Sequence, residues 1–420
     1  MSLSQSESES TTLTLSNLTI LAGPDLELIP KGFIEIREGR ISGLGEGSGG
    51  VNAHQFNCEG LIAIPGLIDA HTHVGDSIAK EAGVGLPIAE VVSPSRGLKH
   101  KILASTSDAA LIASMRESMT DMVRAGITTF ADFRESGMRG ITLLLKAAEG
   151  LRIRPSIFAR LAEVPFTSGE IANNCNRLPS NALKELEELM SKADGISSST
   201  VNDLTDPAME QINDLASVKK RMKAIHVAET AESMEKSRAR TGCGDVERAI
   251  NHLKPDFVVH MTNATENDIE LIAKHRVSVV CCPRANAILG VGVPPVTRII
   301  DHGINVALGT DNVMLNQPDM FREMDYAARV IRGMERNPRR PTCREVLKMA
   351  TVNGARTLKM EKDIGSIECG KIADIVLIDG TDTNLRHSRD IVSSLVLRAG
   401  VHNVRMTLAG GRIAYERPAN

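Results

Sequence analysis

The sequence predicts an α/β protein, a (β/α)8 TIM barrel with a small β-sandwich domain built from both chain termini. Two observations support this fold class. In the middle of the 420-residue chain, apolar runs alternate with helical stretches about eight times, as in a closed parallel barrel. At both ends, β-like runs with Gly turns lie outside this alternation, and we expect them to meet in one small domain.

Domain boundaries follow from the same alternation. The catalytic barrel is assigned to residues 65–349, and the composite β-sandwich to residues 12–64 together with 350–420. Residues 1–11 are polar and rich in Ser and Glu, and are predicted to form a disordered tail.

The predicted barrel strands are apolar runs bounded by Gly, Pro or polar residues. In chain order they are 61–70, 127–133, 154–163, 194–201, 224–229, 257–261, 277–283 and 304–311. Helices are predicted near 105–125, 139–149, 183–193, 207–221, 245–253, 269–275, 296–302 and 319–333. The long segment 74–103, which follows the first strand, is predicted to be the lid of the site.

Five side chains that can bind a metal each end an apolar run: His71, His73, His226, His260 and Asp311. The ends of parallel barrel strands meet at the mouth, and two residues that are two apart on a strand point the same way. Any one of these could be an ordinary strand-end histidine or a turn-forming Asp. Imidazole and carboxylate together suit a divalent ion that activates water, so the set predicts a metal-dependent hydrolase.

Composition narrows the class of partner. The net charge is −3 with both signs mixed, Trp is absent, and no apolar run approaches the roughly 20 residues of a membrane span. The seven cysteines lack C-x-x-C spacing, and the N-terminus has no secretory pattern. We expect a cytoplasmic enzyme that acts on a small molecule and binds neither nucleic acid nor a membrane. The composition is also compatible with a homo-oligomer.

Several motifs resemble the amidohydrolase superfamily: PGLIDAHTHV, HVAE, VVH and LGTDN, with GSIECGKIADIVLID and LAGGRIAYE near the C-terminus. The resemblance covers residues 12–416. Together with CCPRANAILGVGVPPV, it is closest to the chlorohydrolase/aminohydrolase branch, which contains cytosine, guanine and adenosyl-type deaminases.

The resemblance implies site roles. His71, His73, His226 and Asp311 would hold one divalent ion per subunit, zinc first and iron or manganese as alternatives. Binuclear members carry a bridging Lys or Glu at the fourth strand, and DGISSSTV ends with neither. Catalysis would then use Glu229 as a proton shuttle, His260 to orient the attacking water and Asp311 to accept a proton. Positions 226 and 229 face opposite sides of a regular strand. Glu229 can therefore reach the same site as His226 only if the regular strand has ended before residue 229.

Substrate recognition is less specific in the sequence. Arg134, Arg160 and Arg284 follow or end strands and are predicted to reach the mouth, where they would suit an anionic group on the substrate. Asn286 is predicted to shape the pocket, and the run 99–101 to form a solvated helix face. Segment 74–103 lacks the aromatic and Leu-Arg-Gly pattern of adenosyl deaminases, which argues against an adenosyl substrate.

The sequence therefore predicts a hydrolytic deaminase of an amino-substituted heterocycle such as a purine, pyrimidine or pterin, acting through metal-activated water. A chlorohydrolase or cyclic-amide hydrolase on the same scaffold is the alternative. A catalytically silent barrel with an assembly or regulatory role is the third hypothesis.

Overall fold

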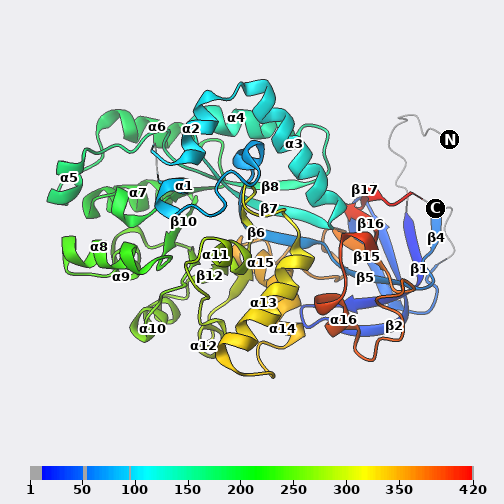
Figure 1. Cartoon of the computed structure of the whole chain (residues 1–420). Helices are drawn as coiled ribbons and strands as arrows, with labels where there is room; N and C mark the ends of the chain where they lie inside the picture. Colours follow the sequence, from blue (N-terminus) through cyan, green and yellow to red (C-terminus); the bar gives the residue numbers. More distant parts are fainter. Residues whose placement is uncertain (1–11, 51–53, 94–95, 419–420) are drawn as a thin grey trace.

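The computed structural model describes residues 12–50, 54–93 and 96–418, so the predicted disordered tail lies outside the described residues. Its two parts are a barrel surrounded by helices and a sheet that gathers strands from both ends of the chain (Figure 1). This arrangement confirms the predicted fold class.

The barrel is a ring of parallel strands. Its strands are β6 (Leu67–His73), β7 (Ile127–Arg134), β8 (Arg154–Ala159), β9 (Gly195–Ser198), β10 (Met222–Val227), β11 (Phe257–His260), β12 (Ser278–Cys281) and β13 (Val306–Leu308). They pair in chain order, and the two-residue strand β14 (Asp311–Asn312) then pairs with β6. Since β14 follows β13 after only two residues, this last pairing closes the ring.

Helices follow the barrel strands as predicted. They include α3 (Asp108–Arg124), α4 (Gly137–Ala148), α6 (Ser180–Met190), α7 (Asp206–Lys219), α8 (Ala231–Thr241), α9 (Asp245–Arg248), α10 (Glu266–His275), α12 (Val296–Asp301) and α13 (Met320–Glu335). Local signals fix where several begin; at α10, for example, Thr265 and Asp268 form a reciprocal capping box. The segment expected as a lid contains η1 (Val74–Ala79), α1 (Ile88–Val92) and α2 (Leu98–Ser105).

Strands from both chain ends form the second sheet. They are β1 (Leu13–Ala22), β2 (Glu27–Arg37), β3 (Arg40–Glu46), β4 (His54–Asn57), β5 (Leu61–Pro65), β15 (Ile375–Asp379), β16 (Val404–Ala409) and β17 (Arg412–Glu416). This sheet has its own apolar cluster, which includes Leu15, Ile34 and Leu377. Helix α15 (Val352–Thr357) packs against barrel strands β6, β12 and β13, and the division at residue 350 stays a prediction.

One predicted strand is wrong. The apolar run 61–70 is two strands: β5 joins the terminal sheet and β6 begins the barrel. Gly66 separates them, and a Cβ there would lie 2.3 Å from Oγ1 of Thr128 and 3.0 Å from Cβ of Asp374. Because an apolar run shows burial but not which sheet a strand joins, sequence alone did not reveal this boundary.

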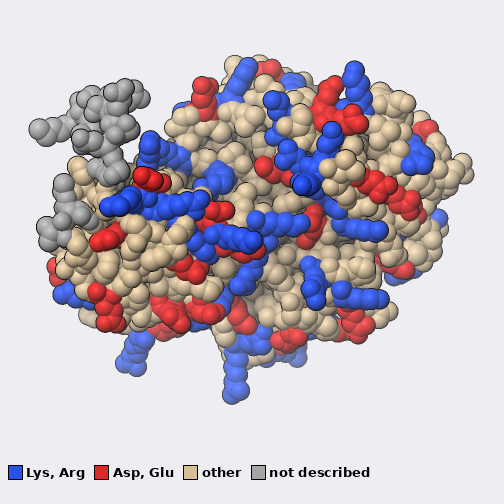
Figure 2. Space-filling view, turned by 180° about the vertical axis from the view of Figure 1, so that it is seen from behind, with Lys and Arg blue, Asp and Glu red and all other residues tan. Residues whose placement is uncertain are grey.

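The barrel interior is filled by large side chains below the mouth. Phe133, Phe158 and Phe257 form a cluster with small residues of neighbouring strands, which makes the barrel a packed core rather than a pore. On the face seen in Figure 2, Lys and Arg side chains are interspersed with Asp and Glu. Within the described residues, no helix is both long enough and apolar enough to cross a membrane.

Candidate metal centre

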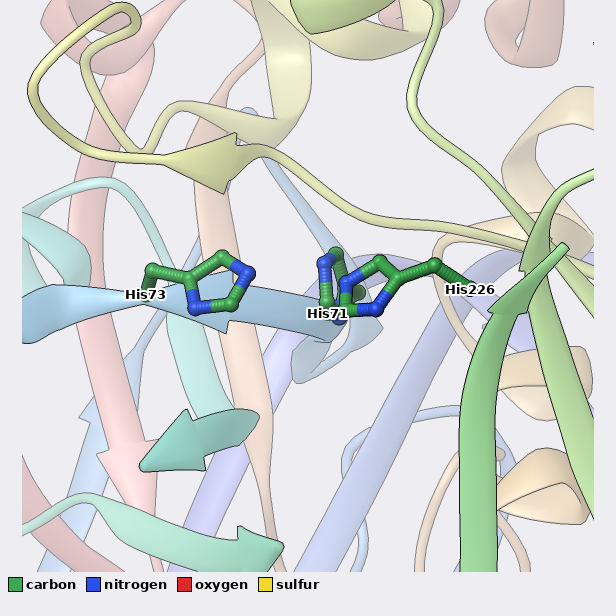
Figure 3. Close-up of side chains that lie close together, drawn as sticks. All are labelled: His71, His73 and His226. Atoms are coloured by element: carbon green, nitrogen blue, oxygen red, sulfur yellow. The ribbon is translucent and has the colours of Figure 1, made fainter. Parts of the chain in front are cut away.

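The five predicted metal-capable side chains meet at the C-terminal ends of the barrel strands. His71 and His73 come from β6, His226 from β10, His260 from β11 and Asp311 from β14. Two overlapping groups have ligand atoms within 4.8 Å of one another: His71 with His73 and His226, and His71 with His260 and Asp311. Figure 3 shows the side chains of His73 and His226 reaching toward His71 from opposite sides.

The Asp311 carboxylate joins the two imidazoles of the first strand. Its Oδ1 lies 3.3 Å from Nε2 of His71 and 3.6 Å from Nε2 of His73. All of these side chains are buried, and neither ring nitrogen of His71 has a hydrogen-bond partner. A buried polar atom without a partner is costly, and a metal ion would satisfy it.

Partners outside the cluster fix the tautomers of the other rings. Nδ1 of His73 lies 2.9 Å from a carboxylate oxygen of Glu135, and Nδ1 of His226 lies 3.2 Å from the carbonyl oxygen of Ser198. Both partners are acceptors, so each ring carries its proton on Nδ1 and keeps the lone pair of Nε2 for the cluster. The donor set therefore fits a divalent ion.

The electrostatics of the cluster favour neutral imidazoles and an ionised carboxylate. Burial lowers the pKa of His73 to about 3, and burial also lowers the pKa of His226 well below its ordinary value. Burial alone would raise the pKa of Asp311, but the contact with His71 and the neighbouring imidazoles hold it below the ordinary value. These are the protonation states that metal binding requires.

Glu229 lies in the same cavity as these side chains, beyond the end of β10. Ala228 adopts the left-handed conformation, with φ +48°, which turns the chain before Glu229. The Glu229 carboxylate lies 3.5 Å from Nε2 of His260 and lines a cavity of about 30 Å³ with His226 and Asp311. Burial raises the pKa of Glu229 above its ordinary value, which favours a protonated carboxyl.

The segment that carries Asp311 is held close to the first strand. Asp69 accepts hydrogen bonds from the backbone N–H and the hydroxyl of Thr310, at 2.9 and 2.5 Å. A Cβ on Gly309 would lie 2.7 Å from Cβ of His71 and 2.9 Å from its backbone nitrogen. Asp311 itself has φ +63°, so its backbone strain is maintained by these neighbours.

An ion network surrounds His73, and it corrects the expectation of a solvated helix face at 99–101. Lys99 is 2% exposed and contacts Glu135 and Asp76, while Lys101 is exposed. Sequence reasoning missed Glu135. It comes directly after the end of β7, and the candidate ligands likewise lie at strand ends. Burial alone would raise the Glu135 pKa, but Lys99, His73 and Arg134 hold it well below its usual range.

The predicted substrate-binding residues lie in different places. Arg160 lines the metal cavity and lies 3.3 Å from Glu135. Arg134 is buried beneath it in ion pairs with Asp132 and Glu135. With these partners Arg134 does not line the metal cavity, and its role in substrate binding stays a prediction.

The other two predicted substrate-binding residues lie beyond the end of β12. Arg284 contacts Glu323 and the carbonyl of Gln317 and does not line the metal cavity, so its role in substrate binding also stays a prediction. Asn286 is fully buried and its Oδ1 lies 3.0 Å from Nδ1 of His260. Asn286 therefore orients His260.

Comparison with known proteins extends this description. The sequence profile of the amidohydrolase family matches residues 62–414. A Methanothermobacter thermautotrophicus protein named as an aminohydrolase is 34% identical over 401 residues, 96% of this chain and 98% of its own length. A 5-methylthioadenosine/S-adenosylhomocysteine deaminase of Caldanaerobacter subterraneus is 30% identical over 85% of this chain and 82% of its own.

A solved structure shares the fold. An adenosine deaminase from Xanthomonas campestris with bound zinc superposes with a TM-score of 0.86, covering 96% of this chain and 92% of that one at 22% identity. Since the family profile spans most of the sequence, the chain belongs to the amidohydrolase family and is a hydrolase of carbon–nitrogen bonds.

Proposed function

We propose that this protein is a hydrolytic deaminase of an amino-substituted heterocycle, with an aminopurine ring as the leading candidate, and that it uses one divalent ion. The observation that carries the proposal is the half-buried Glu229 carboxyl, which lies 3.5 Å from His260 in a cavity that it shares with Asp311 and His226. A deaminase needs a proton donor next to the reacting ring, and here a carboxyl with a raised pKa occupies that place.

His71, His73, His226 and Asp311 would hold the ion, with zinc as the first candidate. When bound, a divalent ion supplies Lewis acidity that makes water a nucleophile at neutral pH. The absence of a Lys or Glu ligand on β9 supports a single ion, since its last residues are Ser197 and Ser198. Relatives named as deaminases of adenosine derivatives support an aminopurine ring as the substrate. They outweigh the argument against an adenosyl substrate that the sequence of segment 74–103 provided.

The protein's own residues divide the proton transfers. Asp311, ionised, accepts a proton from the attacking water. His260 carries its proton on Nδ1, facing Asn286, so its Nε2 can accept a hydrogen bond from that water. Glu229, protonated, donates to the ring nitrogen next to the attacked carbon. The carboxylate that remains takes the proton of the newly added hydroxyl and passes it to the departing amine, which leaves as ammonia, and the proton held by Asp311 then restores the protonated Glu229.

The test is an ammonia-release screen with purified, zinc-loaded protein over aminopurines, aminopyrimidines and aminopterins, with and without substituents. Release of ammonia from an aminopurine supports the proposal if this release requires the bound ion. Halide release from a chlorinated ring, or ring-opening of a cyclic amide without ammonia, would instead support the alternative activities. A zinc-loaded protein that turns over no compound of any of these classes would contradict the assignment.

A further inference from the structure

A second and larger cavity lies beside the metal cavity. It has a volume of about 300 Å³, against about 30 Å³ for the metal cavity, and the two share Arg160 and Ser199 as lining residues. Glu135 and Ser198 also line it, and these are the residues that orient His73 and His226. We call it the side chamber. Since a space of about 30 Å³ holds only one or two waters, a heterocycle at the metal cavity must extend into the side chamber.

Half of the residues that line the side chamber are apolar. Leucine and isoleucine side chains from α2, α6, β9 and α7 line it, namely Leu103, Leu186, Ile196 and Ile212. Two polar atoms in this wall are buried without a hydrogen-bond partner: Oδ2 of Asp203 and Nε2 of His100. Unpartnered polar groups in a partly apolar cavity are the features that orient a bound ligand.

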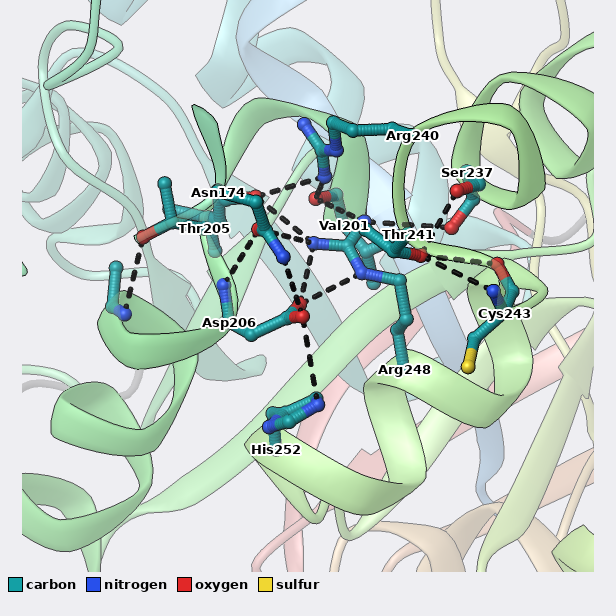
Figure 4. Close-up of polar contacts among 12 residues, drawn as sticks. Asn174, Val201, Thr205, Asp206, Ser237, Arg240, Thr241, Cys243, Arg248 and His252 are labelled. Atoms are coloured by element: carbon teal, nitrogen blue, oxygen red, sulfur yellow. Dashed lines mark hydrogen bonds and ion pairs between the residues drawn. The ribbon is translucent and has the colours of Figure 1, made fainter. Parts of the chain in front are cut away.

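The turn that carries Asp203 is rigidly held from behind. Arg240 donates to the carbonyl oxygens of Val201, Asn202 and Leu204, each at 3.1 Å. Figure 4 shows Arg240 beside Val201. Arg248, 1% exposed, donates to two of the same carbonyls and pairs with Asp206. The backbone of the turn η2 (Val201–Asp203) is therefore fixed, although the Asp203 carboxylate itself forms no ion pair with any described residue.

The charges that line the side chamber are unequally matched. Each of its two arginines is paired with a carboxylate: Arg160 with Glu135, and Arg139 with Asp108. Asp203, and Glu163 which also lines the chamber, form no ion pair with any described residue. A phosphate on the substrate would therefore meet an unpaired carboxylate and no free cation, whereas a hydroxyl could donate to Asp203.

We propose that the side chamber binds the substituent of the substrate ring, with Asp203 accepting hydrogen bonds from its hydroxyls, and that it excludes phosphorylated substituents. This inference rests on the proposed function and makes Asp203 a specificity-determining residue. The preferred substrate is then an unphosphorylated aminopurine with an apolar, hydroxyl-bearing substituent, rather than a free base or a nucleotide.

The experiment compares three probes with zinc-loaded protein: adenine, 5-methylthioadenosine and adenosine monophosphate. We expect kcat/KM for ammonia release to be at least about tenfold higher for 5-methylthioadenosine than for the other two. Asp203→Asn should raise KM for that probe about tenfold with little change in kcat, while Asp214→Asn, an exposed carboxylate on α7, should change neither. Equal kcat/KM for adenine or the monophosphate would overturn the inference and leave the proposed function intact.

A second variant and a binding measurement separate the two proposals further. Ala104→Phe adds bulk from the exposed side of α2, and should lower turnover of 5-methylthioadenosine more than that of adenine. If no probe releases ammonia, the proposed function fails for these rings, and calorimetric binding of 5-methylthioadenosine decides the inference. If 5-methylthioadenosine binds and the Asp203→Asn variant binds it more weakly, the inference about the side chamber is supported. If it does not bind, or binds the variant equally well, the inference is overturned.

Discussion

Single residues set the positions of the groups that would transfer protons. Ala228 is the clearest case: its left-handed backbone lets Glu229 share a cavity with His226, which a regular strand would forbid. The sequence reveals which residue types end each strand. It also shows that positions 226 and 229 would face opposite sides of a regular strand. It does not reveal the φ angle that resolves the conflict, since that angle depends on neighbours such as Asp245, which accepts from the Ala228 N–H.

Glu229→Gln should abolish most deamination while leaving the ion bound. The amide keeps the shape of the side chain but cannot donate and accept the same proton, so kcat should fall by about 10² to 10⁴. Ammonia release and elemental analysis on the same sample measure both quantities. The matched control is Glu232→Gln, an exposed carboxylate at the start of α8, which should keep full activity. Unchanged turnover in Glu229→Gln would remove this residue from the mechanism.

Glu323 makes stability depend on pH. Its side chain is fully buried on α13, and burial raises its pKa from 4.5 to about 8. In the folded state it therefore binds a proton more tightly than in the unfolded state. Its stabilising contribution is complete below about pH 4.5 and is lost as pH rises through about 8.

Glu323→Gln should accordingly flatten the fall in melting temperature between about pH 4.5 and 8, since the amide carries no titrating proton. The exposed Glu117→Gln on α3 serves as control and should follow the wild-type curve. Scanning calorimetry across this range measures the difference. Parallel curves for the wild type and Glu323→Gln would show that Glu323 does not titrate in this window.

At the scale of elements, sequence periodicity predicted the barrel well and the surroundings of the site poorly. The strands that carry the candidate ligands are apolar runs that end in a polar residue, a signal visible in one dimension. Lys99 was misjudged because a charged run on a helix is usually solvated, and here Glu135 and Asp76 from distant segments neutralise it. The break at Gly66 was hidden because both halves of the run are apolar.

Gly309→Ala tests how closely β13 and β14 must approach β6. The new methyl group would lie 2.7 Å from Cβ of His71, so the segment carrying Asp311 must move away. We expect a loss of several kcal/mol in the free energy of unfolding and weaker zinc binding, measured by denaturation and chelator competition. Gly333→Ala on α13 meets no atom within 4 Å and should stabilise by about 0.5–1 kcal/mol. A Gly309→Ala protein with wild-type zinc affinity would contradict this account.

For the whole molecule, the bound ion should stabilise the folded state as well as take part in catalysis. Purified protein should contain about one equivalent of divalent metal, and its removal by a chelator should lower the melting temperature by several degrees. Binding at a thousand times the dissociation constant adds about 4 kcal/mol to folded-state stability. Asp311→Ala should be insensitive to the chelator. Two equivalents of metal would argue against the single-ion site.

Closure of the ring through the two residues of β14 has a consequence for biosynthesis. His71 and His73 leave the ribosome long before Asp311, and the pairing of β14 with β6 joins the first and last pieces of the barrel. A nascent chain that stops short of this segment lacks the Asp311 carboxylate and the pairing that closes the ring. The complete donor set proposed for the ion would therefore form only after translation of the barrel has finished.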